Sequence, residues 1–313
     1  MEKIINTKQP LYIIAGPTAV GKSALGVELA LNCGGEIISA DSMQVYKYMD
    51  IGTAKVTQDE MRGVKHHLID ILEPTEPFSV VDFKNRAEEA IESIVANSHV
   101  PIVVGGTGFY TQALLYDIQF EADGEDTSIR LELEEIAKTE GAQALHNILR
   151  ELDPVTADAV HPNNVKRVIR AIEFARQTGG TLSEHNKEQR ARQSKYDYKY
   201  FVLNDDRDLV YERIDRRVDK MLAEGLLDEV KNLLNMGCTA DMTSMQGIGY
   251  KQILGYLEGN YSFEEAVRLI KRDSRHYAKR QLTWFNREND LIWINRKEYP
   301  DTKSQVEFIL DNI

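Results

Sequence analysis

Short apolar runs alternate with amphipathic helical segments over the first third of the chain. Strands are predicted at residues 11–15, 36–40, 67–72 and 101–104, and helices at residues 22–32 and 80–97. This alternation predicts a parallel, doubly wound α/β sheet, in which ligands bind at the carboxyl ends of the strands. Asp41 and the loop 105–107 each follow a predicted strand directly. We therefore expect both to lie at the ligand-binding edge of the sheet.

The pattern changes in the middle of the chain. From about residue 121 to residue 195 the strand signals disappear, and the segment becomes helical and charged. A strand pattern returns at residues 198–203 and is followed by a long amphipathic helix at 207–236, a strand at 291–295 and a terminal helix at 302–311. We predict an α/β core formed by residues 1–120 and 196–313, which is interrupted by a helical insertion domain at residues 121–195.

A complete Gly-x-x-x-x-Gly-Lys-Ser motif connects the first predicted strand to the first predicted helix. Its residues are Gly16, Pro17, Thr18, Ala19, Val20, Gly21, Lys22 and Ser23. The two glycines permit a close backbone approach, so that consecutive N–H groups and the positive end of the helix point at an anion. Lys22 can neutralise phosphate oxygens, and the Ser23 hydroxyl can hold Mg²⁺. The motif predicts a polyphosphate site on a P-loop NTPase-like fold, without identifying the polyphosphate.

Asp41 is the second residue with a candidate chemical role. A carboxylate directly after an apolar strand of a P-loop protein can hold Mg²⁺, or it can act as a base toward an acceptor beside the phosphates. The alternative is a structural role in a turn or a helix cap. We interpret Asp70, in the middle of a predicted strand, as structural. His66 and His67 have no Cys or Glu at metal-ligand spacing, which also indicates a structural role.

The chain has a negative net charge but contains clusters of basic residues. The formal net charge of −12 over 313 residues argues against a general nucleic-acid coat. Residues 271–287 are nevertheless strongly basic, with one row formed by Lys271, Arg275 and Lys279 and another by Arg272, His276 and Arg280. These rows fit either a solvated face paired with acidic neighbours or an anion-binding face. A second basic set favours a polyanionic partner; it comprises Lys166, Arg167, Arg170 and Arg176.

Targeting and redox signals are absent from the sequence. The first ten residues are short of an apolar core, and no apolar stretch approaches the length of a membrane span. Cys33 and Cys238 lie far apart, without a Cys-x-x-Cys pair. We expect a cytoplasmic monomer with reduced cysteines and no membrane partner.

Seven motifs, in order and spacing, resemble the tRNA dimethylallyltransferase family. They lie at residues 16–23, 39–46, 50–55, 66–70, 104–110, 247–252 and 278–285. The resemblance covers nearly the whole chain, and it is closest to the bacterial type that lacks a zinc finger. It implies transfer of a dimethylallyl group from dimethylallyl diphosphate to N6 of adenosine 37, next to the anticodon of certain tRNAs.

The resemblance also implies roles for individual residues around the leaving group. The P-loop would hold the diphosphate, with Lys22 and a Mg²⁺ ion on Ser23 spreading the charge that develops as the allylic C–O bond breaks. Asp41 would take the proton from N6. Thr18 and Arg217 would contact the diphosphate, with Arg213 as a second candidate. An ion pair on its own helix is the structural alternative for Arg217.

The partner implied by the resemblance is a tRNA anticodon stem-loop, from which adenosine 37 must be flipped out. Residues implied to contact the flipped base and its neighbours are Asp41, Ser42, Met43, Gln44 and Thr107. Residues implied to contact the surrounding RNA are Arg130, Lys166, Arg167, Arg170, Gln246, Gly247, Gly249, Tyr250 and Lys251. The insertion domain would clamp the anticodon loop.

Three other functions use the same motifs. A P-loop nucleotide kinase would bind ATP at the loop, and an adenylate dimethylallyltransferase would modify free AMP without RNA. A non-catalytic RNA-binding protein would be expected to have lost Lys22, Ser23 or Asp41, all of which are present. The basic clusters favour RNA over a mononucleotide, because a mononucleotide needs no such surface.

Overall fold

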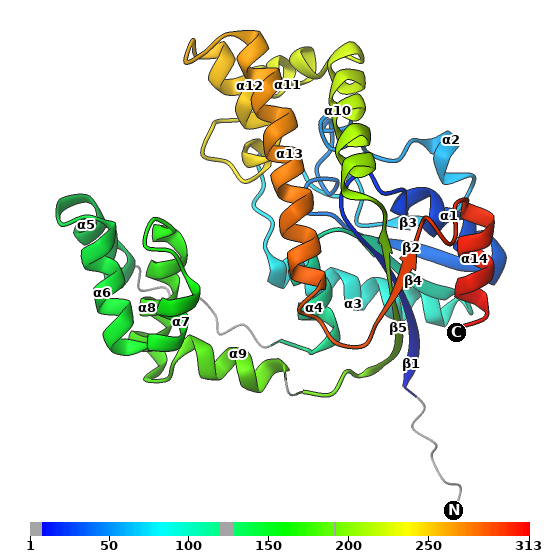
Figure 1. The fold of residues 1–313 in the computed structure, drawn as a ribbon, viewed down its shortest axis with the longest axis horizontal. Coiled ribbons are helices and arrows are strands. Elements are labelled where there is room, and N and C mark those ends of the chain that lie inside the picture. Colours follow the sequence, from blue (N-terminus) through cyan, green and yellow to red (C-terminus); the bar gives the residue numbers. More distant parts are fainter. Residues whose placement is uncertain (1–7, 119–127, 191) are drawn as a thin grey trace, which may run out of the picture. The chain divides into compact units, whose positions relative to one another are not determined.

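The chain folds into two compact units. The computed structural model describes residues 8–118, 128–190 and 192–313 (Figure 1). One unit comprises residues 1–114 and Lys195–Ile313, and the other comprises Leu115–Ser194. The predicted insertion at residues 121–195 falls in the same part of the chain as the second unit. Its first residues, 121–127, and residues 1–7 of the polar N-terminus lie outside the described ranges.

A six-stranded sheet with the order β3-β2-β4-β1-β5-β6 forms the centre of the first unit. Its strands are β1 (Gln9–Ala15), β2 (Gly35–Ala40), β3 (His66–His67), β4 (Val100–Gly105), β5 (Tyr196–Asn204) and β6 (Leu291–Asn295). All pair in parallel, which confirms the predicted α/β fold class. In the register Ala15 lies beside both Gly105 and Val202, so the segments that follow β1 and β4 begin side by side.

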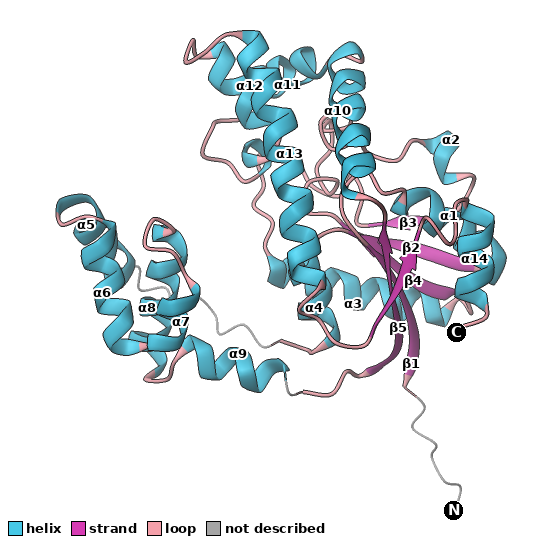
Figure 2. Ribbon diagram, viewed as in Figure 1, coloured by secondary structure: helices cyan, strands magenta, loops and turns pink. Residues whose placement is uncertain are grey.

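Helices cover both faces of this sheet (Figure 2). The helices of the first unit are α1 (Lys22–Cys33), α2 (Gln58–Met61), α3 (Val80–Ala96), α4 (Gly108–Leu115), α10 (Arg207–Ala223), α11 (Leu226–Asn235), α12 (Tyr250–Leu257), α13 (Phe263–Phe285) and α14 (Thr302–Leu310). Helices α1 and α14 share one apolar core with the sheet, whereas α3 packs against β2 and β4. Helices α10 and α13 run side by side, joined by the ion pairs Lys271–Asp219 and Arg275–Asp215.

All secondary-structure elements in the described part of the second unit are helices. It contains α5 (Ser128–Thr139), α6 (Ala142–Leu152), α7 (Pro154–Ala159), α8 (Val165–Thr178) and α9 (Leu182–Arg190). Its own apolar core is built by α5, α6 and α8, which contribute Leu133, Leu149 and Ile172. The buried Asp153 carboxylate accepts hydrogen bonds from the Thr156 and Ser183 backbone N–H groups at 3.0 and 2.9 Å. This carboxylate caps α7 and ties it to the start of α9.

Two predicted elements differ from the structure. The strand predicted at residues 67–72 is wrong, because β3 ends at His67, and Leu68 and Asp70 have left-handed φ values of 62° and 54°. The helix predicted at 207–236 is two helices, because Gly225 with φ 105° ends α10 and begins α11. Asp70 therefore lies in a turn rather than in a strand, where its carboxylate pairs with Lys55.

Candidate active site

The P-loop is held in a shape that only a glycine-bearing sequence can adopt. Gly16 and Gly21 have φ values of 143° and 105°, and Ala19 has 63°. A Cβ on Gly16 would lie 2.5 Å from the Leu203 carbonyl oxygen, so the loop can pass over β5 only as glycine. No side chain caps the N-terminus of α1. Its first N–H groups are therefore available for an anion.

Lys22 folds back over the loop. Its Nζ donates a hydrogen bond to the Pro17 carbonyl oxygen at 2.8 Å. Burial of the ammonium group and the nearby Arg217 guanidinium lower the pKa of Lys22 to about 7, although the Asp41 carboxylate acts in the opposite direction. The P-loop thus holds a lysine whose charge depends on what enters the site.

Arg217 and Arg213 occupy different environments on α10. Arg217 Nη1 donates to the Thr18 hydroxyl oxygen at 3.4 Å, which brings its guanidinium over the P-loop. Burial lowers the pKa of Arg217, and the Asp41 carboxylate counteracts that change. Arg213 instead pairs with the buried Asp205 at the end of β5. Among the described residues Arg217 forms no ion pair, so the structure favours Arg217 over Arg213 as the group that faces an anion on the loop.

Asp41 has the structural role in a turn that was one of its two alternatives, and it leaves one carboxylate oxygen unengaged among the described residues. It follows β2, and its Oδ1 accepts hydrogen bonds from the backbone N–H groups of Met43 and Gln44 at 2.8 and 3.3 Å. These bonds fix the orientation of the carboxylate. Within the described ranges its Oδ2 has no hydrogen-bond partner. One oxygen is therefore anchored while the other can accept a proton.

A cavity of about 320 Å³ lies over these groups. Predicted site residues that line it are Thr18, Asp41, Ser42, Met43, Arg217, Gln246, Gly247, Tyr250 and Lys251. The cavity also has an apolar wall, which was not predicted; it is formed by Ile214, Val218, Met221, Ile248 and Ile270. Three of these residues share a helix face with Arg217. Ile214 lies three positions before it, Val218 one position after it and Met221 four positions after it. That spacing is the sequence signal that could have identified them.

Helix α13 joins the P-loop to the loop after β4, where Thr107 lies. The buried Gln281 accepts a hydrogen bond from the Thr18 N–H at 2.9 Å and donates one to the Gly106 carbonyl oxygen at 2.9 Å. One turn earlier Tyr277 lines the cavity, and its hydroxyl lies close to the side chains of Thr107 and Gln281. Burial and the Asp41 carboxylate raise the pKa of Tyr277 to about 12. Sequence analysis missed both Tyr277 and Gln281.

The segment after Asp41 is fixed by a carboxylate from α11. Glu229 accepts hydrogen bonds from the backbone N–H groups of Asp50, Ile51 and Gly52 at 2.8, 2.8 and 2.9 Å. It also accepts one from the Tyr250 hydroxyl at 2.7 Å. A Cβ on Gly52 would lie 2.5 Å from the Tyr250 ring. The motif at residues 50–55 thus forms part of the cavity wall, through Gly52 and Thr53, and is held in place by Glu229.

The remaining predicted RNA-contacting residues lie in several places. Gly249, with φ 101°, begins α12 beside the cavity. In the second unit Lys166 and Arg167 are exposed on α8, and Arg170 on the same helix is half-buried. Arg130 forms a bidentate pair with the buried Glu173, with bonds of 2.9 and 3.0 Å. The structure therefore gives Arg130 a role within the helical unit.

No group of three His, Cys, Asp or Glu side chains in the described ranges is arranged to hold a metal ion. His67 and His99 instead hydrogen-bond the buried Glu36 carboxylate, each at 2.6 Å, which agrees with a structural role for His67. The Ser23 hydroxyl is exposed at the start of α1. Across the described residues no helix has the length and apolarity that crossing a bilayer requires.

Comparison with known proteins identifies similar sequences and structures. A family model described as IPP transferase matches residues 44–288. A tRNA dimethylallyltransferase of Lachnoclostridium phytofermentans is 60% identical over 93% of both chains. One of Alkaliphilus oremlandii is 46% identical over 97% of this chain and 96% of the relative.

Solved structures of similar proteins cover almost the whole chain. A tRNA isopentenylpyrophosphate transferase of Bacillus halodurans has a TM-score of 0.72 and 44% identity, and the match covers 97% of this chain and 96% of that one. A eukaryotic dimethylallyltransferase acting on tRNA has a TM-score of 0.80 and 31% identity, over 97% of this chain and 79% of that one.

Proposed function

The chain belongs to the IPP transferase family, and on this premise we propose that it transfers the dimethylallyl group of dimethylallyl diphosphate to N6 of adenosine 37 in tRNAs. The observation that carries the proposal is the cavity that Thr18, Arg217 and Asp41 line together with an apolar wall. A diphosphate, a short hydrocarbon chain and an adenine amine each find a matching surface there.

The P-loop and its cations stabilise the leaving group in this reaction. As the allylic C–O bond breaks, negative charge accumulates on the diphosphate, beside the free N–H groups of α1 and the cations Lys22 and Arg217. Stabilisation that grows in the transition state increases the rate. The side chains of Ile214 and Val218 offer an apolar surface for the five-carbon group.

Asp41 completes the transfer on the acceptor side. The N6 lone pair forms the new C–N bond, and the N6 proton passes to the unengaged Oδ2 of Asp41 while Oδ1 stays bound to the Met43 N–H. The products are N6-(dimethylallyl)adenosine in the tRNA and free diphosphate. Because all these groups come from one chain, a monomer suffices for the reaction.

Mg²⁺ fits the donor set at the start of α1. The exposed Ser23 hydroxyl and the diphosphate oxygens are the hard oxygen ligands that this ion prefers. Ser23 would hold the ion, which would neutralise diphosphate charge when bound.

The test is to incubate the protein with labelled dimethylallyl diphosphate and separate pools of tRNA, AMP and ATP. We expect label in tRNA alone, on adenosine after nuclease digestion, and loss of label with Lys22→Met. Label in AMP would instead support an adenylate dimethylallyltransferase. Phosphoryl transfer from ATP, without prenylation, would support a kinase.

A further inference from the structure

Arg296, the residue that follows β6 directly, contacts the P-loop from the other end of the chain. Its Nη1 donates a hydrogen bond to the Val20 carbonyl oxygen at 2.9 Å, across a separation of 276 residues. A Cβ on Gly21 would lie 2.9 Å from the same nitrogen. The guanidinium therefore packs directly against the peptide that joins Val20 to Gly21.

The Asp205 carboxylate holds this guanidinium in position. Only 4% of the Asp205 side chain is exposed, and its Oδ2 lies 3.6 Å from Arg296 Nε. The same oxygen pairs with Arg213, and Oδ1 accepts a hydrogen bond from the Asp206 N–H at 2.8 Å. Arg296 Nη2 donates to the Pro300 carbonyl oxygen at 3.4 Å. Each of the three guanidinium nitrogens of Arg296 thus faces an acceptor, which leaves the side chain little freedom to move off the loop.

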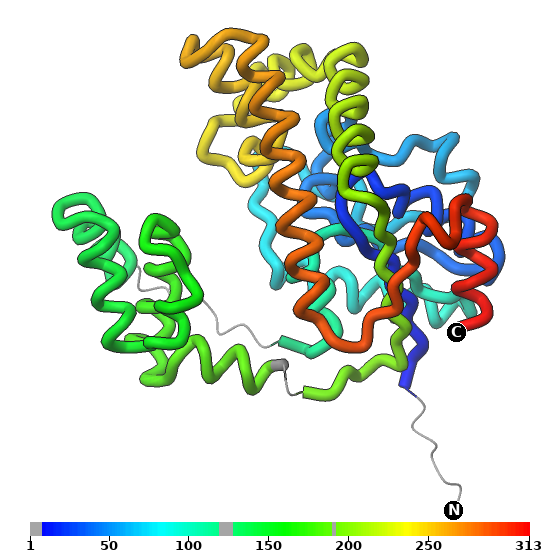
Figure 3. The backbone as a smooth tube through the Cα atoms, in the orientation of Figure 1, coloured from blue at the N-terminus to red at the C-terminus, as the bar shows by residue number. Residues whose placement is uncertain are grey.

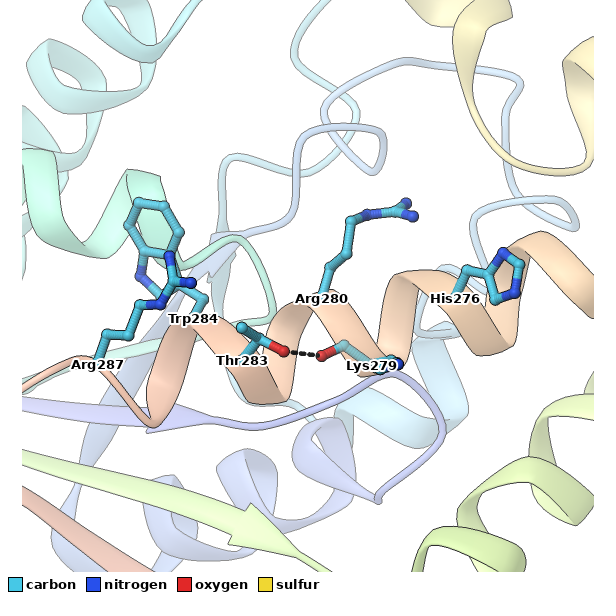
Figure 4. A pocket seen from close by; sticks show the side chains of 6 residues that line it. All are labelled: His276, Lys279, Arg280, Thr283, Trp284 and Arg287. Carbon is cyan, nitrogen blue, oxygen red and sulfur yellow. Dashed lines mark hydrogen bonds between the residues drawn. The ribbon is translucent and has the colours of Figure 1, made fainter. Parts of the chain in front are cut away.

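Arg296 is ion-paired, unlike the cations on the C-terminal part of α13 and the turn that follows it (Figure 4). There Lys279, Arg280 and Arg287 line a pocket of about 470 Å³; all three are exposed and, within the described ranges, form no ion pair with a carboxylate. Such cations attract anions through their charge. The contacts of Arg296 instead indicate that the position of its donor matters to the P-loop.

The hydrogen bond to Val20 determines where the next N–H group points. In a planar trans peptide, the carbonyl oxygen of one residue and the N–H of the next point in opposite directions. Because the Val20 carbonyl oxygen points at Arg296, the Gly21 N–H points away from the guanidinium. In the described part of the chain this N–H donates no hydrogen bond. It is therefore available for an anion bound at the start of α1.

The peptide before Gly21 can turn over unless something holds it. The φ of 105° at Gly21 lies in a region that glycine adopts at little cost, and glycine adopts negative φ values about as readily. An inverted peptide would direct the Val20 carbonyl oxygen, instead of the Gly21 N–H, at the ligand. A carbonyl oxygen repels an anion, so the bond from Arg296 favours the binding-competent orientation.

We propose that Arg296 is a positioning residue of the P-loop, which keeps the Gly21 N–H directed at the diphosphate by binding the Val20 carbonyl oxygen. Asp205 in turn keeps Arg296 in place. The inference rests on the proposed function, since diphosphate is the ligand assigned to the loop there. It makes the end of β6 part of the support of a site formed by residues 16–23.

Isotope labelling makes the Gly21 N–H observable. Val20–Gly21 and Val104–Gly105 are the two Val-Gly peptides of the sequence. Protein labelled with ¹³C at the valine carbonyl and ¹⁵N at glycine therefore gives two signals in an NMR spectrum that selects bonded ¹³C–¹⁵N pairs. Val104→Ala removes the Gly105 signal and so assigns both. Gly105, at the end of β4, reports in every variant whether the sheet is intact.

Inorganic diphosphate is the probe for the orientation of this group. We expect it to move the Gly21 proton signal of the wild type downfield, because a hydrogen bond to a charged acceptor is short and strong. Arg296→Met keeps a long side chain but removes the donors, so this downfield shift should be lost while the Gly105 signal stays in place. An equal shift of the Gly21 signal in both proteins would overturn the proposal.

Binding titrations measure the energetic share of Arg296. Arg296→Met should weaken the affinity for inorganic diphosphate by about tenfold, which is the contribution of one hydrogen bond to a charged group. The ratio of the two affinities should be the same at low and high KCl, because salt screens charge and not orientation. A ratio that falls toward one as KCl increases would show that Arg296 acts through its charge alone, and would overturn the proposal.

Arg275→Met is the matched control. The Arg275 side chain is 30% exposed, compared with 28% for Arg296, and it is likewise paired with a carboxylate, that of Asp215 on α10. Its loss should leave both the diphosphate affinity and the Gly21 shift unchanged. Equal losses in the two variants would show that removal of any such ion pair has this effect, and that Arg296 does not position the loop.

These measurements use inorganic diphosphate without RNA, so they are independent of the test of the proposed function. If labelled donor never reaches tRNA but the Gly21 shift still depends on Arg296, the proposed function fails and the positioning role stands. If tRNA is prenylated and Arg296→Met binds diphosphate as tightly as the wild type does, the positioning role is overturned and the proposed function stands.

Discussion

Lys22 has a pKa of about 7 in this structure, because burial and the Arg217 guanidinium disfavour its charged form. A bound diphosphate favours the charged form and must raise that pKa. Above about pH 7, binding therefore takes up a proton, and the affinity falls by about tenfold per pH unit until the bound-state pKa is reached. Calorimetry of diphosphate binding at pH 8, in two buffers of different ionisation enthalpy, measures this uptake.

The guanidinium variant Lys22→Arg is the control for that measurement, because arginine stays protonated throughout this range. It should bind diphosphate without proton uptake. With dimethylallyl diphosphate as the ligand, ionisation of the ligand does not imitate the effect, since the last pKa of a phosphate ester lies at about 6 and this ligand is ionised at pH 8. A wild-type affinity that does not change between pH 7 and pH 9 would contradict the prediction.

Asp41→Asn removes the proposed base and keeps the turn. The amide oxygen can still accept hydrogen bonds from the Met43 and Gln44 N–H groups, but the side chain cannot take up the N6 proton. We expect a single-turnover rate about 100-fold lower, with RNA and donor affinity largely retained. Rapid-quench measurements with saturating RNA test this. A rate equal to that of the wild type would exclude Asp41 as the base.

Helix α13 connects the P-loop to the loop after β4 through Gln281. Gln281→Leu leaves the Thr18 N–H and the Gly106 carbonyl oxygen without their partner, which costs about 1–3 kcal/mol of unfolding free energy. Because those groups hold the P-loop against the loop that carries Thr107, we expect diphosphate affinity to fall as well. Denaturant unfolding and binding titrations give the two quantities.

A matched variant separates the effect of Gln281 on the P-loop from its effect on stability. Gln305 on α14 is equally buried and donates to the Tyr299 carbonyl oxygen at 2.8 Å, far along the chain from the P-loop residues. Gln305→Leu should lower stability by a similar amount and leave diphosphate affinity unchanged. Equal loss of affinity in both variants would show that Gln281 acts only through stability.

Near the amino ends of the strands, the Glu36 carboxylate is bound by several basic side chains. Burial alone would raise the pKa of Glu36, but hydrogen bonds from His67, His99 and Lys65 lower it to about 2. The stabilisation is complete above about pH 4.5 and is lost as the pH falls toward about 2. Glu36→Gln should therefore flatten the acid limb of a stability–pH curve between these values. An unchanged limb would contradict the assignment.

Elements that are determined by residues close together in the sequence were predictable. Helix α3 begins where expected because Ser79 and Asp82 form a capping box, and the P-loop is recognised from its own spacing. The early end of β3 was not predictable from sequence. The left-handed backbone conformation of Leu68, which ends the strand, depends on packing and not on the pattern of apolar residues. Gln281 was missed because its partner Thr18 lies 263 residues away. Pairings of this kind leave no mark in a local pattern.

At the scale of the whole molecule, the net charge is negative, so RNA binding depends on local clusters of basic residues. Lys166 and Arg167 are exposed on α8, so the double variant Lys166→Ala/Arg167→Ala should flatten the slope of log affinity against log salt by about 0.7–0.9 per lost contact. Lys271→Ala should leave the slope nearly unchanged, because Asp219 already neutralises that charge. Filter-binding titrations at several salt concentrations provide the slopes.

A different result would redirect the interpretation of these clusters. If the double variant loses stability or donor affinity while the salt slope stays constant, the α8 cations serve the helical unit alone. RNA phosphates would then have to be bound by other residues, with the exposed cations at the end of α13 as the next set to neutralise.

The central strand β1 gains its second neighbour only when β5 pairs with it, and between β4 and β5 the chain leaves the sheet to build the helical unit (Figure 3). During synthesis on a ribosome, β1 therefore has an open edge until residue Asn204 has left the exit tunnel. The helical unit has only internal partners to wait for and can finish earlier. A nascent chain stopped before β5 presents an unpaired, apolar strand edge beside a P-loop that still lacks its support from Leu203. We expect chaperones to bind such a stalled chain, because its strand edge is unpaired.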